Sequence, residues 1–262
     1  MSKEQLKYLK NIKNEKYLVK IIQIIIIFII IILWEYLTHK GIISSFIYSS
    51  PSKIIKTIIE LFNADNLFNH IFITLKEVLI SFIIGNILGF IIATLLYEFN
   101  IVAKILDPFL TMLNSLPKVA LGPLIIIIFG SNIKSIIIMA LLINLIVSII
   151  TIYNGFLSTN EYELKLFKSL KATHWQILTM LVIPSSYQTI IASFKLSIAQ
   201  TLVGVIMGEF LVSKEGIGYL IVYGKQVFNL NYVMTGIILL AIISYLLYKI
   251  IITFEKKLLK EK

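Results

Sequence analysis

The chain has 262 residues, of which 58% are hydrophobic and only 15% are charged, and its mean hydropathy is +0.92. This charged fraction is too small to cover the surface of a water-soluble domain, so the composition excludes an ordinary soluble protein and indicates a membrane protein. The net charge is +10, all 24 basic residues are lysines, and the lack of cysteine excludes disulfides, thiolate metal sites and cysteine nucleophiles.

A segment needs about 20 mostly apolar residues to cross the hydrocarbon of a bilayer as a helix. Six segments meet that condition with few charges, and in chain order they are Tyr17–Leu37, Val78–Tyr97, Asp107–Phe129, Ile133–Ile152, Ile190–Leu211 and Tyr232–Phe254. The sequence therefore predicts an all-α polytopic membrane protein with about six transmembrane helices.

Three prolines interrupt the third of these segments, at Pro108, Pro117 and Pro123. A broken helix persists inside a membrane only where neighbouring protein or a water-lined cavity satisfies the freed carbonyl groups. We therefore interpret this segment as a candidate pore lining.

The distribution of lysines predicts the orientation. Six spans place both termini on one side of the membrane, where 14 lysines lie, compared with seven on the other side. The positive-inside rule then makes both termini cytoplasmic, and lysines at segment ends argue against a nucleic-acid partner. Residues 1–16 are expected to form a basic cytoplasmic segment, either a short helix on the inner leaflet or a disordered tail, and residues 17–262 a single transmembrane domain.

The longest cytoplasmic connection, residues 153–188, is predicted to contain two helices. Ser158 and Glu161 have the spacing of a capping box, and Thr173 and Gln176 repeat it. Pro184 is expected to end the second helix and to leave the residue before it extended.

The first of these helices carries a narrow apolar stripe, because Leu164, Phe167 and Leu170 recur every three residues among charged neighbours. Such a stripe needs a surface to cover it. It either packs against its own bundle or docks in a groove on a soluble partner.

The spacing of this connection resembles the EAA loop of permease subunits of binding-protein-dependent ABC importers. That pattern is Glu-Ala-Ala, three residues, Gly, nine residues, an aliphatic pair and Pro. Aligned on Pro184, the aliphatic positions hold Leu181 and Ile183, the Gly position holds Lys171, and Lys165-Leu166-Phe167 stands in place of Glu-Ala-Ala. Lysine in a left-handed turn costs ~1 kcal/mol relative to glycine. Glu161 or Glu163 is the expected alternative source of an acidic contact.

Two further stretches resemble the nitrate, sulfonate and taurine branch of these permeases. They are Asn114-Ser-Leu-Pro-Lys-Val-Ala-Leu-Gly-Pro-Leu124 and Gly208-Glu-Phe-Leu-Val-Ser-Lys-Glu-Gly-Ile-Gly-Tyr-Leu-Ile221. The resemblance implies a type I (MetI-like) ABC importer permease, a homodimer around one pore, a pair of cytoplasmic ATPases and an extracytoplasmic binding protein. It implies no cofactor and no enzymatic activity of this chain. Nitrate, taurine, alkanesulfonates and pyrimidine precursors of thiamine are the solutes that it allows.

Two groups of candidate functional residues follow from these motifs. The predicted ATPase-coupling residues are Glu161, Glu163, Leu164, Phe167, Leu170, Lys171, Ala172 and Pro184. The predicted pathway residues are Asn114, Ser115, Pro117, Asn144, Lys195, Gln200 and Glu209, which are polar, charged or helix-breaking residues within or near the spans. For the uncharged polar residues, hydrogen bonding between helices is the alternative interpretation, and for Lys195 and Glu209 it is snorkelling to an interface. Gly85 and Gly89 match the small-residue motif of helix packing.

Other function classes have weaker sequence support. An ion-gradient-driven secondary transporter, the main alternative, would be expected to show acidic residues near mid-span and repeated hydropathy, and neither is clear. Gly218, Gly224 and Lys225 do not have the spacing of a phosphate-binding loop. His39, His70 and His174 are scattered over different loops, which argues against a metal centre or a general base.

Overall fold

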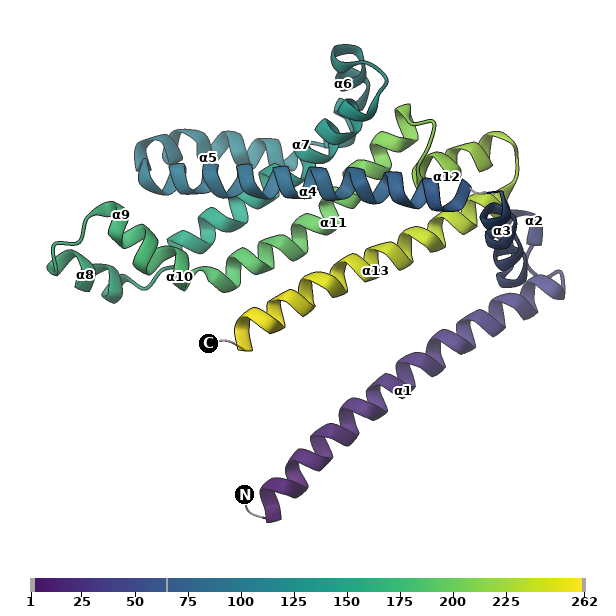
Figure 1. Ribbon diagram of the computed structural model, residues 1–262, viewed down its shortest axis with the longest axis horizontal. Helices are drawn as coiled ribbons and strands as arrows, with labels where there is room; N and C mark the ends of the chain where they lie inside the picture. The colour runs from purple at the N-terminus through teal and green to yellow at the C-terminus, as the bar shows by residue number, and fades with distance from the viewer. Residues whose placement is uncertain (1–2, 65, 261–262) are drawn as a thin grey trace.

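We describe a computed structural model that covers residues 3–64 and 66–260. Residues 1–2, 65 and 261–262 lie outside the described residues, and with them Lys262, one of the lysines counted on the cytoplasmic side. Within the described residues, five helices are long and apolar enough to cross a membrane, and a bent pair of helices makes a sixth candidate span. The five helices are α1 (Lys3–His39), α4 (Asn66–Glu98), α7 (Ile133–Leu157), α11 (Tyr187–Val212) and α13 (Leu230–Lys260). The predicted all-α membrane architecture is confirmed (Figure 1).

The third predicted span is not one straight helix. It consists of α5 (Asn100–Ser115), a short 3-10 helix η1 (Lys118–Leu121) and α6 (Gly122–Phe129), and its two halves meet at 88°. The bend begins at Leu116, whose ψ of 140° is extended. The ring of Pro117 disfavours a helical conformation at the preceding residue, so this proline breaks the segment. Pro108, by contrast, lies within α5.

Helix α1 differs from both alternatives considered for residues 1–16. From Lys3 onward these residues continue into the first span as one helix of 37 residues, which at 1.5 Å per residue is about 55 Å long. Its C-terminal end is fastened by Glu35, whose carboxylate accepts hydrogen bonds from the amide of Ser52 at 3.0 Å and from its hydroxyl at 2.8 Å. Elsewhere α1 diverges from the other helices (Figure 1).

The core of the bundle is the packing of α4, α7 and α11. Gly85 and Gly89 of α4 face Asn144 and Ser148 of α7, and a methyl group at either glycine would collide with these side chains. On the other side of α7, a Cβ atom at Gly204 of α11 would lie 2.5 Å from the Cα atom of Ala140. Small residues therefore let the three backbones approach closely, as predicted for Gly85 and Gly89.

One end of the bundle carries three helices that the search for long apolar segments did not predict. They are α2 (Ser45–Tyr48), α3 (Pro51–Asn63) and α12 (Ile217–Gln226). Helix α3 has a serine cap at Ser50, a proline at its first position, and a buried face of Ile54, Thr57 and Leu61. We call this the opposite end.

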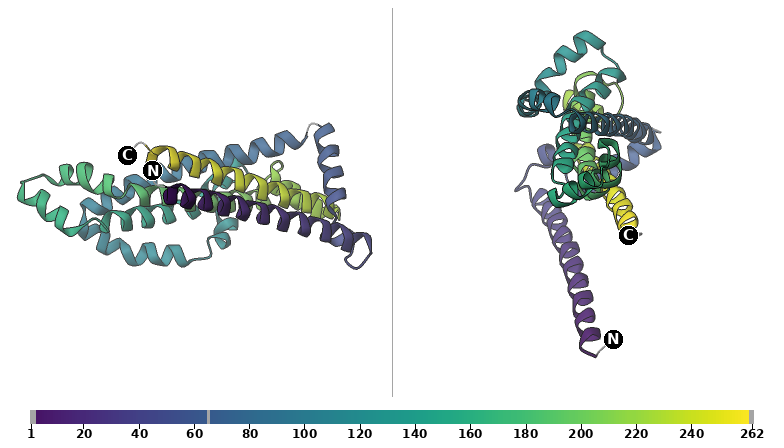
Figure 2. Two further views of the ribbon diagram at one scale, coloured as in Figure 1. Left: turned by 90° about the horizontal axis from the view of Figure 1, so that it is seen from below. Right: turned by 90° about the vertical axis from the view of Figure 1, so that its left-hand side faces the viewer.

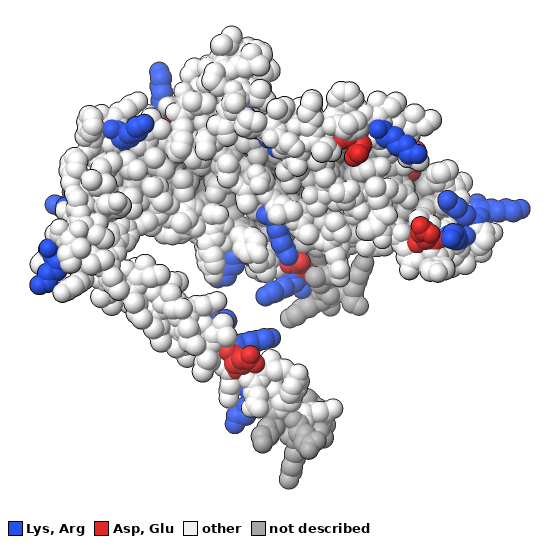
Figure 3. All heavy atoms as spheres, turned by 180° about the vertical axis from the view of Figure 1, so that it is seen from behind, with Lys and Arg blue, Asp and Glu red and all other residues white. Residues whose placement is uncertain are grey.

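The other end, which we call the terminal end, lies toward the two chain termini (Figures 1 and 2). It holds α8 (Glu161–Ser169), α9 (His174–Ile177), a π-helical turn η2 (Leu178–Val182) and α10 (Ile183–Ser185). Figure 3 shows a largely uncharged face with a group of charged side chains over this end, at the right. That distribution suits a bundle whose middle lies in lipid.

Candidate functional site

The start of α8 is not the predicted one. Its N-cap is Asn160, whose side chain accepts a hydrogen bond from the amide of Tyr162 at 2.9 Å. Ser158 instead ends α7, and its hydroxyl donates to the carbonyl of Gly155 at 2.7 Å. The predicted cap is wrong because the asparagine, two residues nearer to the helix, reaches the free amides first.

The predicted capping box at the start of α9 is confirmed. The amide of Gln176 donates to the hydroxyl of Thr173 at 3.3 Å, and the Gln176 side chain accepts from the Thr173 amide at 2.8 Å. This reciprocal pair fixes the point at which the chain turns from α8 into α9.

The turn between α8 and α9 is closed by backbone hydrogen bonds around Lys171. The amide of Ala172 donates to the carbonyl of Phe167 at 3.1 Å, and the amide of Lys171 donates to the carbonyl of Lys168 at 3.0 Å. This is the Schellman pattern, and Lys171 has the left-handed φ of 57° that the pattern requires. A lysine therefore occupies a conformation that favours glycine.

Pro184 does not end the helix before it. Ile183, the preceding residue, is helical with φ −62° and ψ −48°, which contradicts the expected extended conformation. The π-helical turn η2 lies just before this proline. Its wider hydrogen-bond spacing accommodates a residue that cannot donate a helical hydrogen bond and whose ring crowds the turn before it. The chain thus passes from α9 to α11 with only a short interruption at Ser186.

The apolar stripe of α8 is divided between two environments. Leu164 and Phe167 pack against the buried cluster that contains Ile152 and Phe156 of α7. This part of the stripe therefore packs against its own helix bundle. Leu170, in contrast, is 71% exposed. The other exposed large apolar side chains of this end are Tyr162, Leu166, Trp175 and Met180. We call Leu166, Leu170 and Trp175 the exposed apolar patch of the terminal end.

The remaining predicted coupling residues lie around this patch. Glu161, Glu163, Lys171 and Pro184 are exposed, whereas Ala172 is half-buried. The carboxylate of Glu161 lies 3.7 Å from the ammonium group of Lys165, one turn along α8. The terminal end thus presents apolar side chains with charges of both signs beside them.

Three predicted pathway residues lie together at the bend of the broken span. Asn114, Ser115 and Pro117 are exposed. Lys118, the next residue, is held there because its ammonium group donates to the backbone carbonyl of Asn114 at 3.2 Å and to its side-chain oxygen at 3.3 Å. The bend therefore carries a polar, cationic surface on a segment of span length.

Three other predicted pathway residues lie elsewhere in the bundle. Asn144 is fully buried, accepts a hydrogen bond from the Ser197 hydroxyl, and donates to the carbonyl of Ser81 at 3.4 Å, so it joins α7 to α11 and α4. Lys195 forms an ion pair with Glu255 of α13, with a nitrogen–oxygen distance of 2.6 Å. Gln200 is exposed. The structure thus does not bring these residues together with Asn114.

Glu209 is 1% exposed and holds the N-terminus of α12 against α4. Its carboxylate accepts from the Thr74 hydroxyl at 2.6 Å and from the amide of Gly218 at 2.5 Å. His70 and Thr74 in turn accept from the amides of Gly216 and Ile217. Gly216 has φ +102°, and a Cβ atom there would collide with the Glu209 carboxylate, which explains the glycine.

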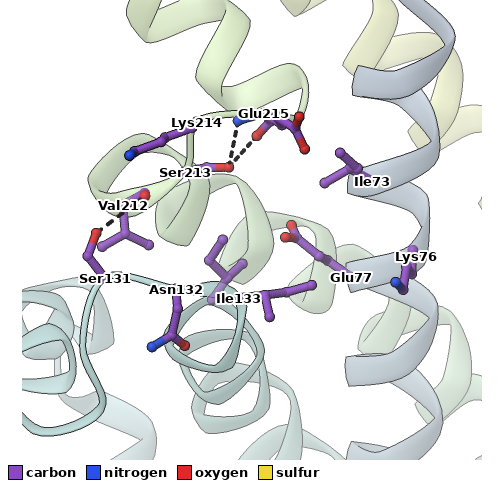
Figure 4. Close-up of a pocket in the computed structure, with 11 residues that line it drawn as sticks. Ile73, Lys76, Glu77, Ser131, Asn132, Ile133, Val212, Ser213, Lys214 and Glu215 are labelled. Carbon is purple, nitrogen blue, oxygen red and sulfur yellow. Dashed lines mark hydrogen bonds between the residues drawn. The ribbon is translucent and has the colours of Figure 1, made fainter.

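The residue that sequence reasoning missed is Glu77 of α4. It is 2% exposed and lines a cavity of about 580 Å³ between α4, the start of α7 and the segment that follows α11 (Figure 4). Ser131, Asn132, Ser213 and Lys214 are among the other lining residues. The second predicted span begins at Val78 and therefore leaves Glu77 outside it, whereas α4 begins twelve residues earlier, at Asn66.

Comparisons with known proteins agree with this architecture. A family model described as "Binding-protein-dependent transport system inner membrane component" matches residues 85–260. A Bacillus subtilis (strain 168) protein named "Putative aliphatic sulfonates transport permease protein" is 28% identical over 88% of this chain and 83% of its own length. The formylaminopyrimidine transport permease protein of Halalkalibacterium halodurans is 26% identical over 72% of this chain and 75% of its own length.

The fold has a solved counterpart. A structure of the inward-facing MetNI methionine ABC transporter contains a chain that superposes with a TM-score of 0.65 at 17% identity, over 73% of this chain and 95% of that one. The predicted MetI-like core is confirmed as the fold of this protein.

Proposed function

The chain belongs to the binding-protein-dependent transport system inner membrane components and is the translocation subunit of an ATP-driven importer, and on this premise we propose how its parts serve transport. The terminal end binds a pair of separate ATPase subunits. The chain itself hydrolyses no ATP and provides the path for the solute.

The observation that carries the proposal is the exposed apolar patch of the terminal end. Leu166, Leu170 and Trp175 project from a hairpin whose other apolar residues already pack on the bundle. Apolar side chains on a hydrophilic hairpin outside the spans are typical of a protein interface. Because η2 and α10 join this hairpin to α11, a shift of the docked hairpin would move α11 within the bundle.

The bend of the broken span supports a pore shared by two copies of the chain. Asn114 and Ser115 are exposed and Lys118 is half-buried, on a broken segment that is long enough to cross the membrane. Polar and cationic groups are costly against lipid and face protein or a water-filled path. A second copy placed against this surface would enclose such a path, which supports a homodimer.

The lysine distribution supports an orientation with the terminal end in the cytoplasm, and hence both termini there. The protein would then lie in the plasma membrane with the opposite end outside. An extracytoplasmic binding protein would meet the surface formed by α2, α3 and α12. The names of the two relatives, an aliphatic sulfonate permease and a formylaminopyrimidine permease, favour a small organic solute of one of these classes. Taurine and nitrate are the other candidates that the sequence resemblance implies.

Reconstitution tests this function. The permease, co-expressed with the ATPase and binding protein of its own organism, is placed in proteoliposomes and uptake of the bound solute is measured. We expect uptake that needs ATP on the side of the terminal end and persists when ion gradients are collapsed. Uptake by the permease alone, driven by a proton or sodium gradient, would establish the secondary-transporter alternative instead.

A further inference from the structure

Two glutamates lie side by side at the opposite end of the bundle, and they differ in their partners. Glu209 is 1% exposed and Glu77 is 2% exposed. Glu209 uses both carboxylate oxygens, one for the Thr74 hydroxyl and one for the amide of Gly218. Its role in holding α12 accounts for its burial.

Glu77 has no such role. Its Oε2 atom is buried and has no hydrogen-bond partner among the described residues. A buried polar atom without a partner is destabilising by about 1–3 kcal/mol, so a group that donates a hydrogen bond to it would stabilise the site.

The unpartnered oxygen belongs to a residue that faces a cavity. Figure 4 shows the Glu77 carboxyl group directed between α4 and the segment of Ser213 and Lys214. The cavity volume of about 580 Å³ is sufficient for a small organic molecule. Lys76, Lys214 and Glu215 are exposed lining residues, so the lining carries exposed charges of both signs.

We propose that this cavity binds the transported solute by an amino group, which donates a hydrogen bond to Oε2 of Glu77. An anionic group on the same molecule would face Lys76 or Lys214 at the mouth. The assignment rests on the proposed function, since it places solute at the opposite end of a permease. A hydrogen bond to Glu77 would restrict the expected solutes to small molecules that carry a primary amine.

Matched probes test the amine directly on the full-length permease in lipid nanodiscs. Taurine and ethanesulfonate differ only in the amine, as do 4-aminopyrimidine and pyrimidine. A membrane-permeant diazo ester converts buried carboxyl groups to esters with loss of nitrogen and does not activate them toward amines, and peptide mass spectrometry reads Glu77 and Glu209 separately. We expect at least one amine to protect Glu77 at a concentration about fivefold lower than its amine-free analogue, the ratio that one hydrogen bond of ~1 kcal/mol provides. Protection that is equal within both pairs would overturn the proposal.

Glu209 is the internal control, because it is equally buried but has its own partners. Its labelling is expected to be the same with and without each probe. Protection of Glu209 to the same extent as Glu77 would point to a general change in the bundle and would overturn the assignment.

Variants add a second test, read as the probe-induced shift in thermal stability of the permease. Glu77→Leu removes the acceptor and is expected to abolish the preference for the amine. Glu77→Gln keeps a side-chain oxygen and is expected to retain the preference, as is Glu60→Gln, a change at an exposed carboxylate of α3 that does not line the cavity. A preference that survives Glu77→Leu would contradict the proposal.

These measurements need neither ATP nor an ATPase. They therefore test amine binding at Glu77 separately from ATPase coupling at the terminal end. A complex that performs ATP-driven uptake but shows no amine preference refutes only the role of Glu77. A permease that prefers amines but moves solute without an ATPase refutes the proposed coupling.

Discussion

Phe167 and Leu170 lie three residues apart on the same stripe of α8, but they face different surroundings. The ring of Phe167 packs against the cluster around Phe156, whereas the Leu170 side chain is 71% exposed. A substitution at Phe167 therefore acts on the permease fold, and one at Leu170 acts on whatever the hairpin binds. This difference decides which variant tests ATPase association.

Leu170→Glu is expected to abolish co-purification of the ATPase and ATP-driven uptake while the permease keeps its thermal stability. A charge at an exposed position costs the fold little, but it places a desolvated carboxylate in the proposed interface. Phe167→Ala is the matched comparison, with an expected loss of roughly 1–3 kcal/mol of stability because part of a packed ring is removed. If Leu170→Glu still associates with the ATPase and transports normally, the docking surface is elsewhere.

Lys171→Gly is expected to stabilise the terminal end. Lys171 has φ 57°, and glycine adopts that conformation at about 1 kcal/mol lower cost than residues with a Cβ atom. Lys171→Val, with its branched Cβ, should lower stability instead. Thermal unfolding in detergent, supported by protease resistance of the hairpin, measures both changes. A Gly variant that is less stable than the wild type would contradict this expectation. It would show that contacts of the Lys171 side chain stabilise the fold by more than the left-handed backbone conformation destabilises it.

The ion pair of Lys195 and Glu255 is expected to join α11 to α13. Both side chains are partly buried, with 26% and 21% exposed, and their charged atoms lie 2.6 Å apart. Lys195→Glu should destabilise the bundle by about 1–2 kcal/mol, because it places two carboxylates together. The double variant Lys195→Glu with Glu255→Lys should recover most of that loss. Failure of the exchange to restore stability would mean that Lys195 has another partner, such as a group in the pathway.

The long helices were predictable because length and hydropathy decide membrane insertion, and those properties are local. The Thr173 capping box was likewise predictable from spacing, and the left-handed turn at Lys171 was implied by the glycine position of the family pattern. The start of α8 was not, because Ser158 and Asn160 both have side chains that cap helices, and which one does so depends on where α7 ends. The short helices α2, α3 and α12 were missed, since a search for spans ignores helices that cover the end of a bundle.

The site was harder to predict than the fold. Nothing in the spacing of Phe167 and Leu170 tells which one meets the bundle, because that depends on the position of α7. Glu77 and Glu209 are 132 residues apart in the sequence, and only the packing of α4 against α11 brings them together. The helical continuity through Pro184 depends on a π turn that has no clear sequence signal.

The central claim is that the terminal end is held by an ATPase, and cross-linking tests it most directly. The chain has no cysteine, so Leu170→Cys introduces a single thiol at the exposed apolar patch, and Phe228→Cys, 79% exposed near the opposite end, is the control. In transport-competent membranes we predict that a short bifunctional reagent joins Leu170→Cys to the ATPase and does not join Phe228→Cys to it. Labelling of Leu170→Cys from outside the cell, or no cross-link to the ATPase in membranes that transport, would contradict the account.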